Sequence, residues 1–261
     1  MRHKRMLAIA ALTALSACSA GLMHFAWPQH SGGYYKQIFQ AGNQAFVNKD
    51  FAAALERYKE LLNMELADPV LYFNAGNAYA QLGQAGRATY MYEKALRLDP
   101  RDEAAAYNLR KVEPEENRQT PFILLAPFVS LLRFLTLDEW AWLFSALWFA
   151  TAILIAAALL VETDLPRRYS KFCAWIVGAF CLFALSMLGV KYQTQVLHDE
   201  GIVLEYVVTR AGPSGEFNEE FKLPTGRKVR VTHQSPEGWC EIAIPGESKQ
   251  TYIPADKLGL L

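Results

Sequence analysis

The feature that most constrains the fold is a segment that recurs after 34 residues. In the stretch "LYFNAGNAYAQLGQ" (71–84), large side chains alternate with small ones, and the same order occurs one period earlier. Small residues let two helices approach closely, and aromatic residues fill the space between neighbouring pairs of helices. The pattern therefore predicts two consecutive helical hairpins, at 35–68 and 69–102. The register pairs Phe39 with Phe73, Ala41 with Ala75, Gly42 with Gly76, Asn43 with Asn77, Ala54 with Ala88, Tyr58 with Tyr92, Leu62 with Leu96 and Asp68 with Asp102.

The copy at 69–102 resembles the tetratricopeptide repeat, with Gly76 at the close helix crossing and Tyr79 three residues later. The copy at 35–68 departs from that pattern, because Ala45 stands in place of the Tyr and Leu66 in place of the closing Pro. Two copies are fewer than the roughly three that usually make a stable array. We therefore expect "RDEAAAYNLRKV" (101–112) to form a capping helix, which completes an all-α repeat domain over 34–112.

Composition separates the remainder of the chain into membrane-like and soluble regions. The 26 basic and 26 acidic residues balance, so there is no basic field of the kind that binds nucleic acid. Apolar residues concentrate in an N-terminal block and in residues 121–190, as in a membrane protein.

The N-terminal block, residues 1–27, has the composition of a signal peptide or a signal anchor. The basic "MRHKR" precedes an apolar run from Met6 to Ala20. Within it, "LSAC" (15–18) resembles the lipobox of bacterial lipoproteins, which makes Cys18 a candidate for lipidation. The stretch that follows, "SAGLMHFAW", stays apolar where a lipoprotein usually has a polar tether. Lipidation at Cys18, cleavage without a lipid and an uncleaved anchor remain three alternatives.

Two further apolar runs predict a transmembrane hairpin over 138–192. Residues 140–161 and 172–190 carry no charged side chain, and 22 residues of helix span about 33 Å, enough to cross the hydrocarbon core. The short loop between them contains Arg167, Arg168 and Lys171, which places it in the cytoplasm by the positive-inside rule. The repeats and the C-terminal region are then both expected on the outer, periplasmic side of a bacterial cytoplasmic membrane.

The segment 120–137 is apolar but contains Pro121, Pro127 and Arg133, which argue against a third span in that position. We interpret it as an amphipathic helix lying in the membrane interface. The alternative is a buried connector packed under the repeats.

From residue 199 onward, short β-branched runs separated by Gly, Pro and polar clusters predict a small all-β barrel over 199–261. The order of these runs resembles bacterial SH3 domains. In the penultimate strand, Thr251-Tyr252 replaces the usual Gly-Trp, which puts an intact aromatic groove in doubt. The matching residues are Gly226, Val229, Val231, Trp239, Ile242, Ile253 and Pro254.

The complete order of segments resembles the BatE-type proteins of bacterial aerotolerance operons: a signal or anchor, repeats, two spans with a basic loop, and a terminal SH3-like domain. The resemblance covers most of the chain, including "YNLRKVEP" and the Trp-rich first span. It implies a membrane-anchored partner of von Willebrand factor A-domain membrane proteins and, indirectly, of a MoxR-type ATPase. No catalytic residue accompanies the resemblance.

Catalytic and cofactor chemistry has little support in this sequence. The five histidines lie far apart, without the spacing of metal ligands, and there is no glycine-rich phosphate loop. In the strand that contains Trp239 and Cys240, alternation turns one side chain inward, and we expect that one to be Trp239. A catalytic cysteine would require a nearby histidine and a helix N-terminus, and neither is evident around Cys240. The sequence therefore predicts a protein that is not an enzyme and holds no cofactor or metal.

The repeat groove is the predicted binding surface. The first helix of each hairpin should line it, because asparagine can bond a peptide backbone and phenylalanine offers apolar area. The alternative is that Phe39 and Phe73 belong to the core between helices. The candidate residues are Lys36, Phe39, Asn43, Phe46, Val70, Phe73, Asn77 and Gln81.

These features favour a non-enzymatic membrane scaffold that presents two outward-facing interaction modules to protein partners. The alternative from another class is a membrane protein that binds peptidoglycan through the SH3-like domain. A third reading is an assembly factor for exported redox proteins, which also uses periplasmic repeats but usually lacks an SH3-like end.

Overall fold

A computed structural model describes residues 33–64, 67–118, 126–161, 163–193 and 199–261. Residues 137–193 form one compact unit, and the described residues before and after them form a second unit. The segment 1–27 with Cys18, and residues 120–125 of the predicted interfacial segment, lie outside the described residues. The multi-domain class predicted from sequence is confirmed: a helical repeat region, two long apolar helices and a separate antiparallel β domain.

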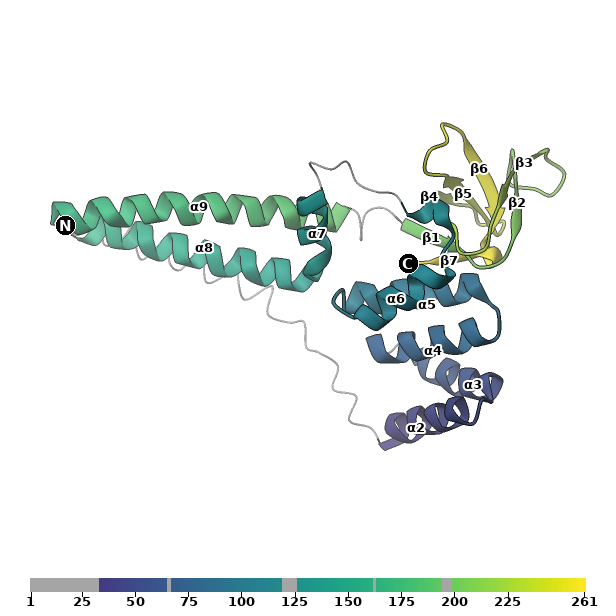
Figure 1. Cartoon of the computed structure of the whole chain (residues 1–261). Helices are drawn as coiled ribbons and strands as arrows, with labels where there is room; N and C mark the ends of the chain where they lie inside the picture. Colours follow the sequence, from purple (N-terminus) through teal and green to yellow (C-terminus); the bar gives the residue numbers. More distant parts are fainter. Residues whose placement is uncertain (1–32, 65–66, 119–125, 162, 194–198) are drawn as a thin grey trace. The chain divides into compact units, whose positions relative to one another are not determined.

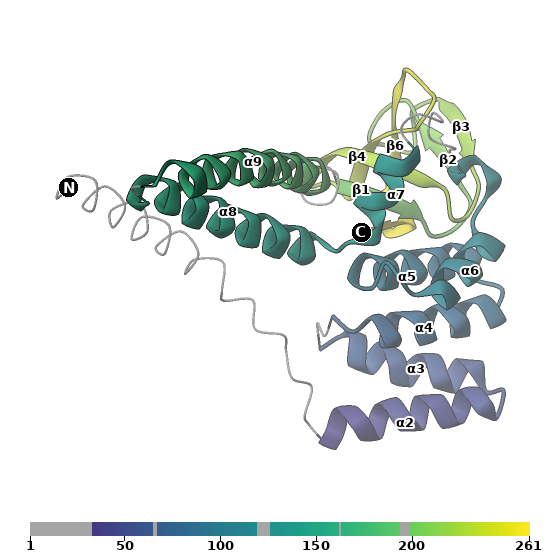
Figure 2. The ribbon, with the colours of Figure 1, turned by 60° about the vertical axis from the view of Figure 1, so that its left-hand side comes forward.

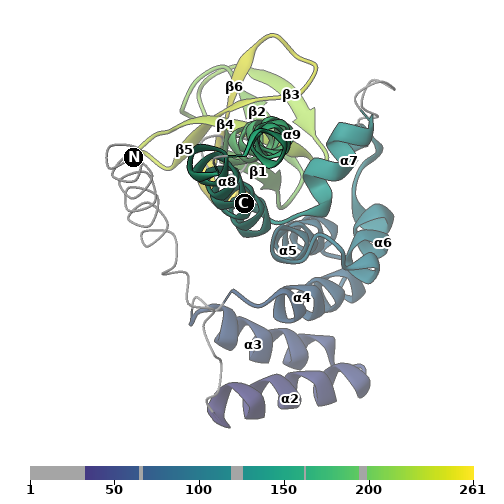
Figure 3. The same ribbon diagram turned by 90° about the vertical axis from the view of Figure 1, so that its left-hand side faces the viewer.

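The repeat region consists of five helices: α2 (Gly33–Val47), α3 (Phe51–Leu62), α4 (Pro69–Gln81), α5 (Ala85–Leu98) and α6 (Glu103–Val112). Figures 2 and 3 show them stacked in chain order. Asp68 and Asp102, which are related by the repeat, each accept hydrogen bonds from two backbone N–H groups at the start of α4 and α6. Such caps satisfy donors that have no partner within the helix, so the 34-residue period also sets where the helices begin.

Tyrosine and glycine pairs determine how closely the repeat helices pack. Tyr58 and Tyr92 are each only 1% exposed in the core of the repeat region. A Cβ atom on Gly42 would lie 2.6 Å from the ring of Tyr58, and one on Gly76 would lie 2.7 Å from the ring of Tyr92. Both glycines are therefore required for the close approach of the two helices in their hairpin.

The β domain contains seven strands in one antiparallel sheet (Figure 1). The pairing order is β3-β2-β6-β5-β4-β1-β7, so the sheet is open, with β3 and β7 at its two ends, where the sequence suggested a barrel. The strands are β1 (Asp199–Val203), β2 (Val207–Arg210), β3 (Glu219–Leu223), β4 (Lys228–Gln234), β5 (Trp239–Ala243), β6 (Gln250–Pro254) and β7 (Leu258–Leu260).

The core of the β domain corrects one expectation from sequence. Cys240 is 1% exposed and belongs to the core with Ile242 and Ile253, whereas Trp239 is only partly buried. The expectation that Trp239 faces inward was wrong. Side chains alternate along a strand, and β5 turns Cys240 and Ile242 to the same inner face. A single alternating pair cannot reveal which of its two faces is the inner one.

The β domain packs against α5, a contact that the sequence did not predict. A Cβ atom on Gly86 of α5 would lie 2.3 Å from the backbone oxygen of Leu204 and 2.6 Å from that of Val203. On Gly259 of β7, a Cβ atom would lie 2.8 Å from the ring of Tyr90 in α5. Glycine therefore allows backbone-to-helix contact at two points along this interface.

Polar groups also join the two domains. Asn117, in the short 3₁₀ helix η1 (Glu115–Asn117), donates from Nδ2 to the carbonyl oxygen of Gly226 at 2.7 Å. Its Oδ1 accepts from the backbone N–H of Lys228 at 2.9 Å. Ion pairs supplement these bonds between the same two domains: Arg87 with Glu205 at 2.6 Å, Arg97 with Glu200 at 2.9 Å and Lys228 with Glu93 at 2.9 Å.

The other unit is a pair of antiparallel helices, α8 (Leu137–Leu160) and α9 (Asp164–Tyr192). Each is long and apolar enough to cross a membrane. The rings of Trp140 and Phe183 meet edge to face, with centroids 6.5 Å apart, at one end of the pair. Before α8, within the repeat-containing unit, α7 (Ala126–Phe134) has no buried side chain.

Candidate functional site

Two clusters of asparagine and tyrosine repeat along the helical region. Asn43 Oδ1 accepts hydrogen bonds from Tyr58 Oη at 2.8 Å and from Asn74 Nδ2 at 3.1 Å. These three residues form the first asparagine cluster. It joins α2, α3 and α4, so one polar cluster ties a hairpin to the first helix of the next hairpin.

The second asparagine cluster repeats this arrangement 34 residues later. Asn77 Oδ1 accepts from Tyr92 Oη at 2.7 Å and from Asn108 Nδ2 at 2.8 Å. Because Asn108 lies on α6, this helix occupies the position that the first helix of a third repeat would have. The predicted capping helix therefore continues the hydrogen-bond pattern of the repeat.

Burial extends to higher pH the range in which the two tyrosines donate hydrogen bonds. Desolvation raises the pKa of Tyr58 to about 12 and that of Tyr92 to about 12. Both phenols therefore stay protonated at neutral pH, and their protons go to the asparagine oxygens. In this geometry each asparagine points its Oδ1 toward the tyrosine hydroxyl, and its Nδ2 points away from that hydroxyl.

A pocket of about 280 Å³ opens beside the first cluster. Among the described residues, neither Asn43 Nδ2 nor Asn77 Nδ2 donates a hydrogen bond, so both amide groups are available to a ligand. An extended peptide has carbonyl oxygens that could accept from them. The lining residues are Asn43, Phe46, Val47, Tyr58, Asn74 and Asn77.

The structure brings only some of the predicted groove residues to this pocket. Asn43, Phe46 and Asn77 line it, as the sequence suggested. Phe39 and Phe73 are partly buried and instead pack against the repeat core, beside the rings of Tyr58 and Tyr92 respectively, which supports the core alternative. The other candidates are exposed and do not line the pocket: Lys36, Val70 and Gln81.

Sequence reasoning missed the second asparagine of each cluster, Asn74 and Asn108. These two are also 34 residues apart, so extending the repeat comparison past residue 102 would have paired them. Tyr58 and Tyr92 were paired by the period, but nothing in the sequence shows that their hydroxyls hold the groove asparagines.

A metal-ligand cluster or a reactive Cys240 thiol would bear on catalysis in the described part of the chain. It contains no group of three or more His, Cys, Asp or Glu side chains placed to hold a metal ion. Burial raises the pKa of the Cys240 thiol. A raised pKa keeps the sulfur protonated, which is the opposite of what a nucleophilic cysteine needs.

The comparisons with known proteins concern the repeat region. Residues 69–102 match the family model "Tetratricopeptide repeat". Similar proteins include the small glutamine-rich tetratricopeptide repeat-containing protein 2 of Mycosarcoma maydis, 32% identical over 66 residues, which are 25% of this chain and 19% of that protein. Sperm-associated antigen 1 of Rattus norvegicus is 32% identical over 78 residues, which are 28% of this chain and 9% of that protein.

This chain thus covers less than a fifth of either relative, and the likeness does not extend to their whole-protein roles. The matched copy contains Asn77 and Tyr92 of the second asparagine cluster. Residues 69–102 are a tetratricopeptide repeat.

Proposed function

We propose that this protein is a non-enzymatic membrane adaptor whose repeat groove binds an extended segment of a partner protein. The observation that carries the proposal is the pair of asparagine clusters, spaced by one repeat, with an amide of each open to a ligand. Amide donors at a regular spacing suit the regular spacing of carbonyl groups along an extended chain. Phe46 and Val47 add apolar area beside the first amide.

The adaptor would be held in the membrane by α8 and α9. Both helices meet the length and composition of a membrane span. Arg167, Arg168 and Lys171 lie in the first turns of α9, which favours a cytoplasmic position for the end where α8 meets α9. Because the two helices are antiparallel, the repeats and the β domain would then share the outer side, consistent with their mutual contacts.

The partners that we propose are von Willebrand factor A-domain membrane proteins, with a MoxR-type ATPase linked indirectly, in a Bat-type aerotolerance or stress-related complex. The support is the order of segments along the chain, which resembles that of BatE-type proteins. Because the β domain packs on α5, both domains would meet a partner as one body.

Crosslinking in intact bacterial cells tests this proposal. The full chain carries an affinity tag after Leu261, and crosslinked partners are purified in detergent and identified by mass spectrometry. We expect von Willebrand factor A-domain proteins to be recovered with the native chain. Asn43→Ala together with Asn77→Ala should reduce their recovery about tenfold or more, the effect of losing roughly 1.4 kcal/mol of binding free energy.

The matched control replaces two exposed asparagines outside the groove, Asn63→Ala together with Asn218→Ala, and should leave recovery unchanged. Circular dichroism of both variants checks that the helices remain folded. Equal recovery with the groove variant would contradict the proposed binding site. Recovery of wall fragments alone would contradict the adaptor and favour the peptidoglycan-binding alternative.

A further inference from the structure

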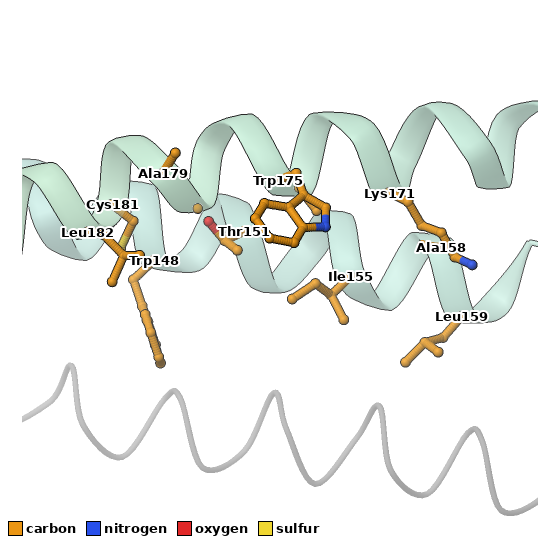
Figure 4. A pocket seen from close by; sticks show the side chains of 12 residues that line it. Trp148, Thr151, Ile155, Ala158, Leu159, Lys171, Trp175, Ala179, Cys181 and Leu182 are labelled. Carbon is orange, nitrogen blue, oxygen red and sulfur yellow. The ribbon is translucent and has the colours of Figure 1, made fainter.

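The hairpin of α8 and α9 has a groove of about 570 Å³ along one face. Trp148, Ile155 and Leu159 of α8 project on the same side of the hairpin, and Trp175 and Leu182 of α9 belong to the same groove (Figure 4). Trp175 is 81% exposed and Leu182 is 70% exposed within the described chain. These large side chains form the walls of a concave apolar surface.

The floor of the groove consists of small residues. Thr151 and Gly178 face each other there, and a Cβ atom on Gly178 would lie 3.8 Å from Thr151 Cγ2. The hydroxyl of Thr151 donates to the backbone oxygen of Leu147 at 2.8 Å, so it does not require a partner from outside. A narrow helix could therefore enter between the large walls and approach the floor, as membrane helices do at small residues.

We propose that the apolar segment 6–27 of this same chain occupies the groove as a third membrane helix. The proposal rests on the membrane placement of the hairpin given above. Residues 6–27 contain no Asp, Glu, Lys or Arg. As a helix, these 22 residues would span about 33 Å, which matches the hydrocarbon core. The run from Met6 to Ala20 by itself has the length of a signal-peptide core, so the proposal depends on the uncharged stretch continuing to Trp27.

The basic residues before this segment predict its orientation across the membrane. Arg2, Lys4 and Arg5 precede the apolar run, and the positive-inside rule assigns them to the cytoplasmic face, together with the basic loop of the hairpin. The segment would then run parallel to α9. Its far end would carry Trp27, a residue type that favours the interface, on the outer side, as would the start of α8 with Trp140.

If the segment is a helix, as proposed, its small residues would form one stripe that suits the floor of the groove. Ala10, Ala14, Ala17 and Gly21 lie within about 60° of one another at 100° per residue. Counted from the basic residues at the cytoplasmic face, Ala14 is nine residues beyond Arg5 and Gly178 is seven beyond Lys171. The two then differ in depth by about 3 Å.

Other occupants of the groove would be a second copy of the hairpin or a helix of another protein. The segment 6–27 has the advantage of being in the same chain, because a tethered helix binds at a high effective concentration. It also supplies the three properties that the groove requires: apolar surface, sufficient length and a face narrow enough for the floor.

The first measurement is the intact mass of the full chain purified from bacterial membranes. The proposal expects residues 6–27 to be retained. A chain that begins at a lipid-modified Cys18, or at a residue after Ala20, would overturn it. Washing the same membranes with alkaline carbonate tests the premise. Release of the chain would contradict the membrane placement and, with it, that part of the proposed function.

The second measurement is disulfide formation in membranes. The native cysteines are replaced by alanine, Ala14→Cys is combined with Gly178→Cys, and a protease site replaces residues 29–32. After oxidation with copper phenanthroline and cleavage, the N-terminal fragment should stay attached to its own chain. The matched control, Leu12→Cys with Gly178→Cys, places the thiol on the opposite side of the helix and should lose the fragment.

A second control, Thr151→Cys with Gly178→Cys, shows that the oxidant reaches this depth. Loss of the fragment from the Ala14→Cys chain while this control forms its bond would overturn the proposal. Disulfides between two chains would overturn it in favour of a second copy as the occupant. In either case, undiminished recovery of partners through the repeat groove would leave the proposed function intact.

Discussion

The side chain of Asn77 has two ends with different tasks. Its oxygen accepts from Tyr92 and Asn108, which fixes the amide plane, and its nitrogen makes no hydrogen bond among the described residues, while the residue lines the pocket. Such an arrangement fixes the orientation of the donor before a ligand arrives, so less conformational entropy is lost on binding. The same residue therefore contributes to folding through one atom and to the proposed binding through another.

Gly86→Ala should loosen the contact between the β domain and α5. The added Cβ atom would lie 2.3 Å from a backbone oxygen, and a backbone atom cannot move aside as a flexible side chain would. Overpacking of this kind costs about 1–3 kcal/mol. Chemical denaturation of the full chain in detergent measures the free energy of unfolding. Gly33→Ala is the control, because its Cβ atom meets nothing within 4 Å, and it should not destabilise.

Glu113→Gln should stabilise the repeat unit at neutral pH. Burial, and then the nearby carboxylate of Glu93, raise the pKa of Glu113 above its ordinary value of 4.5. A raised carboxyl pKa means that ionisation disfavours the folded state, and this cost disappears as pH falls from the raised pKa to the ordinary one. Unfolding midpoints at neutral pH and near pH 4 measure the effect. At neutral pH the unfolding midpoint of the variant should be higher than that of the native chain, and the difference between the two midpoints should shrink on acidification. An equal difference in unfolding midpoint at both pH values would contradict a raised pKa at Glu113.

At the scale of elements, α6 and η1 connect the repeat to the sheet. Asn108 of α6 completes the second asparagine cluster, and Asn117 of η1 bonds the turn that leads into β4. The segment that ends the repeat therefore also holds the β domain. The second copy and its continuation have partners on both sides, whereas α2 packs against α3, shares the first cluster and donates from Tyr35 Oη to the carboxylate of Asp68.

Asn117→Ala should expose the start of β4. The substitution leaves the carbonyl of Gly226 and the N–H of Lys228 without their side-chain partner. Losing such bonds costs about 1–3 kcal/mol. Hydrogen exchange followed by mass spectrometry should show faster exchange in residues 226–231. Glu116→Ala, at an exposed neighbouring position of η1, is the control and should exchange like the native chain.

At the scale of the whole molecule, the repeats and the β domain should open together. They share glycine-mediated packing, the bonds of Asn117 and ion pairs, all within one compact unit. Native-state hydrogen exchange in low denaturant should give α4, α5 and β4 a common free energy of opening. Two distinct values would show that the domains are joined only by loose contacts. Gly86→Ala should separate the values if the packing causes the coupling.

The difference between what was and was not predictable follows from the range of each interaction. Period, glycine spacing and capping aspartates act within one hairpin or between adjacent ones, and so they are visible as repeated letters. The contact of Gly86 with Leu204 joins residues 118 positions apart, and no pattern in either segment specifies the other. The inner face of β5 was misjudged for a similar reason, because the core to which Cys240 belongs is built from distant strands.

By itself, the sequence determined the two hairpins, the two apolar helices, the β domain and the asparagines of the groove. It could do so because periodicity, hydropathy and turn residues express local physics that each segment satisfies alone. Only the tertiary structure decided that Tyr58 and Tyr92 hold those asparagines, that Phe39 and Phe73 pack against the core, and that the β domain packs on α5. These outcomes depend on which buried polar group meets which partner and on whether a Cβ atom has room, and both are settled when distant segments pack.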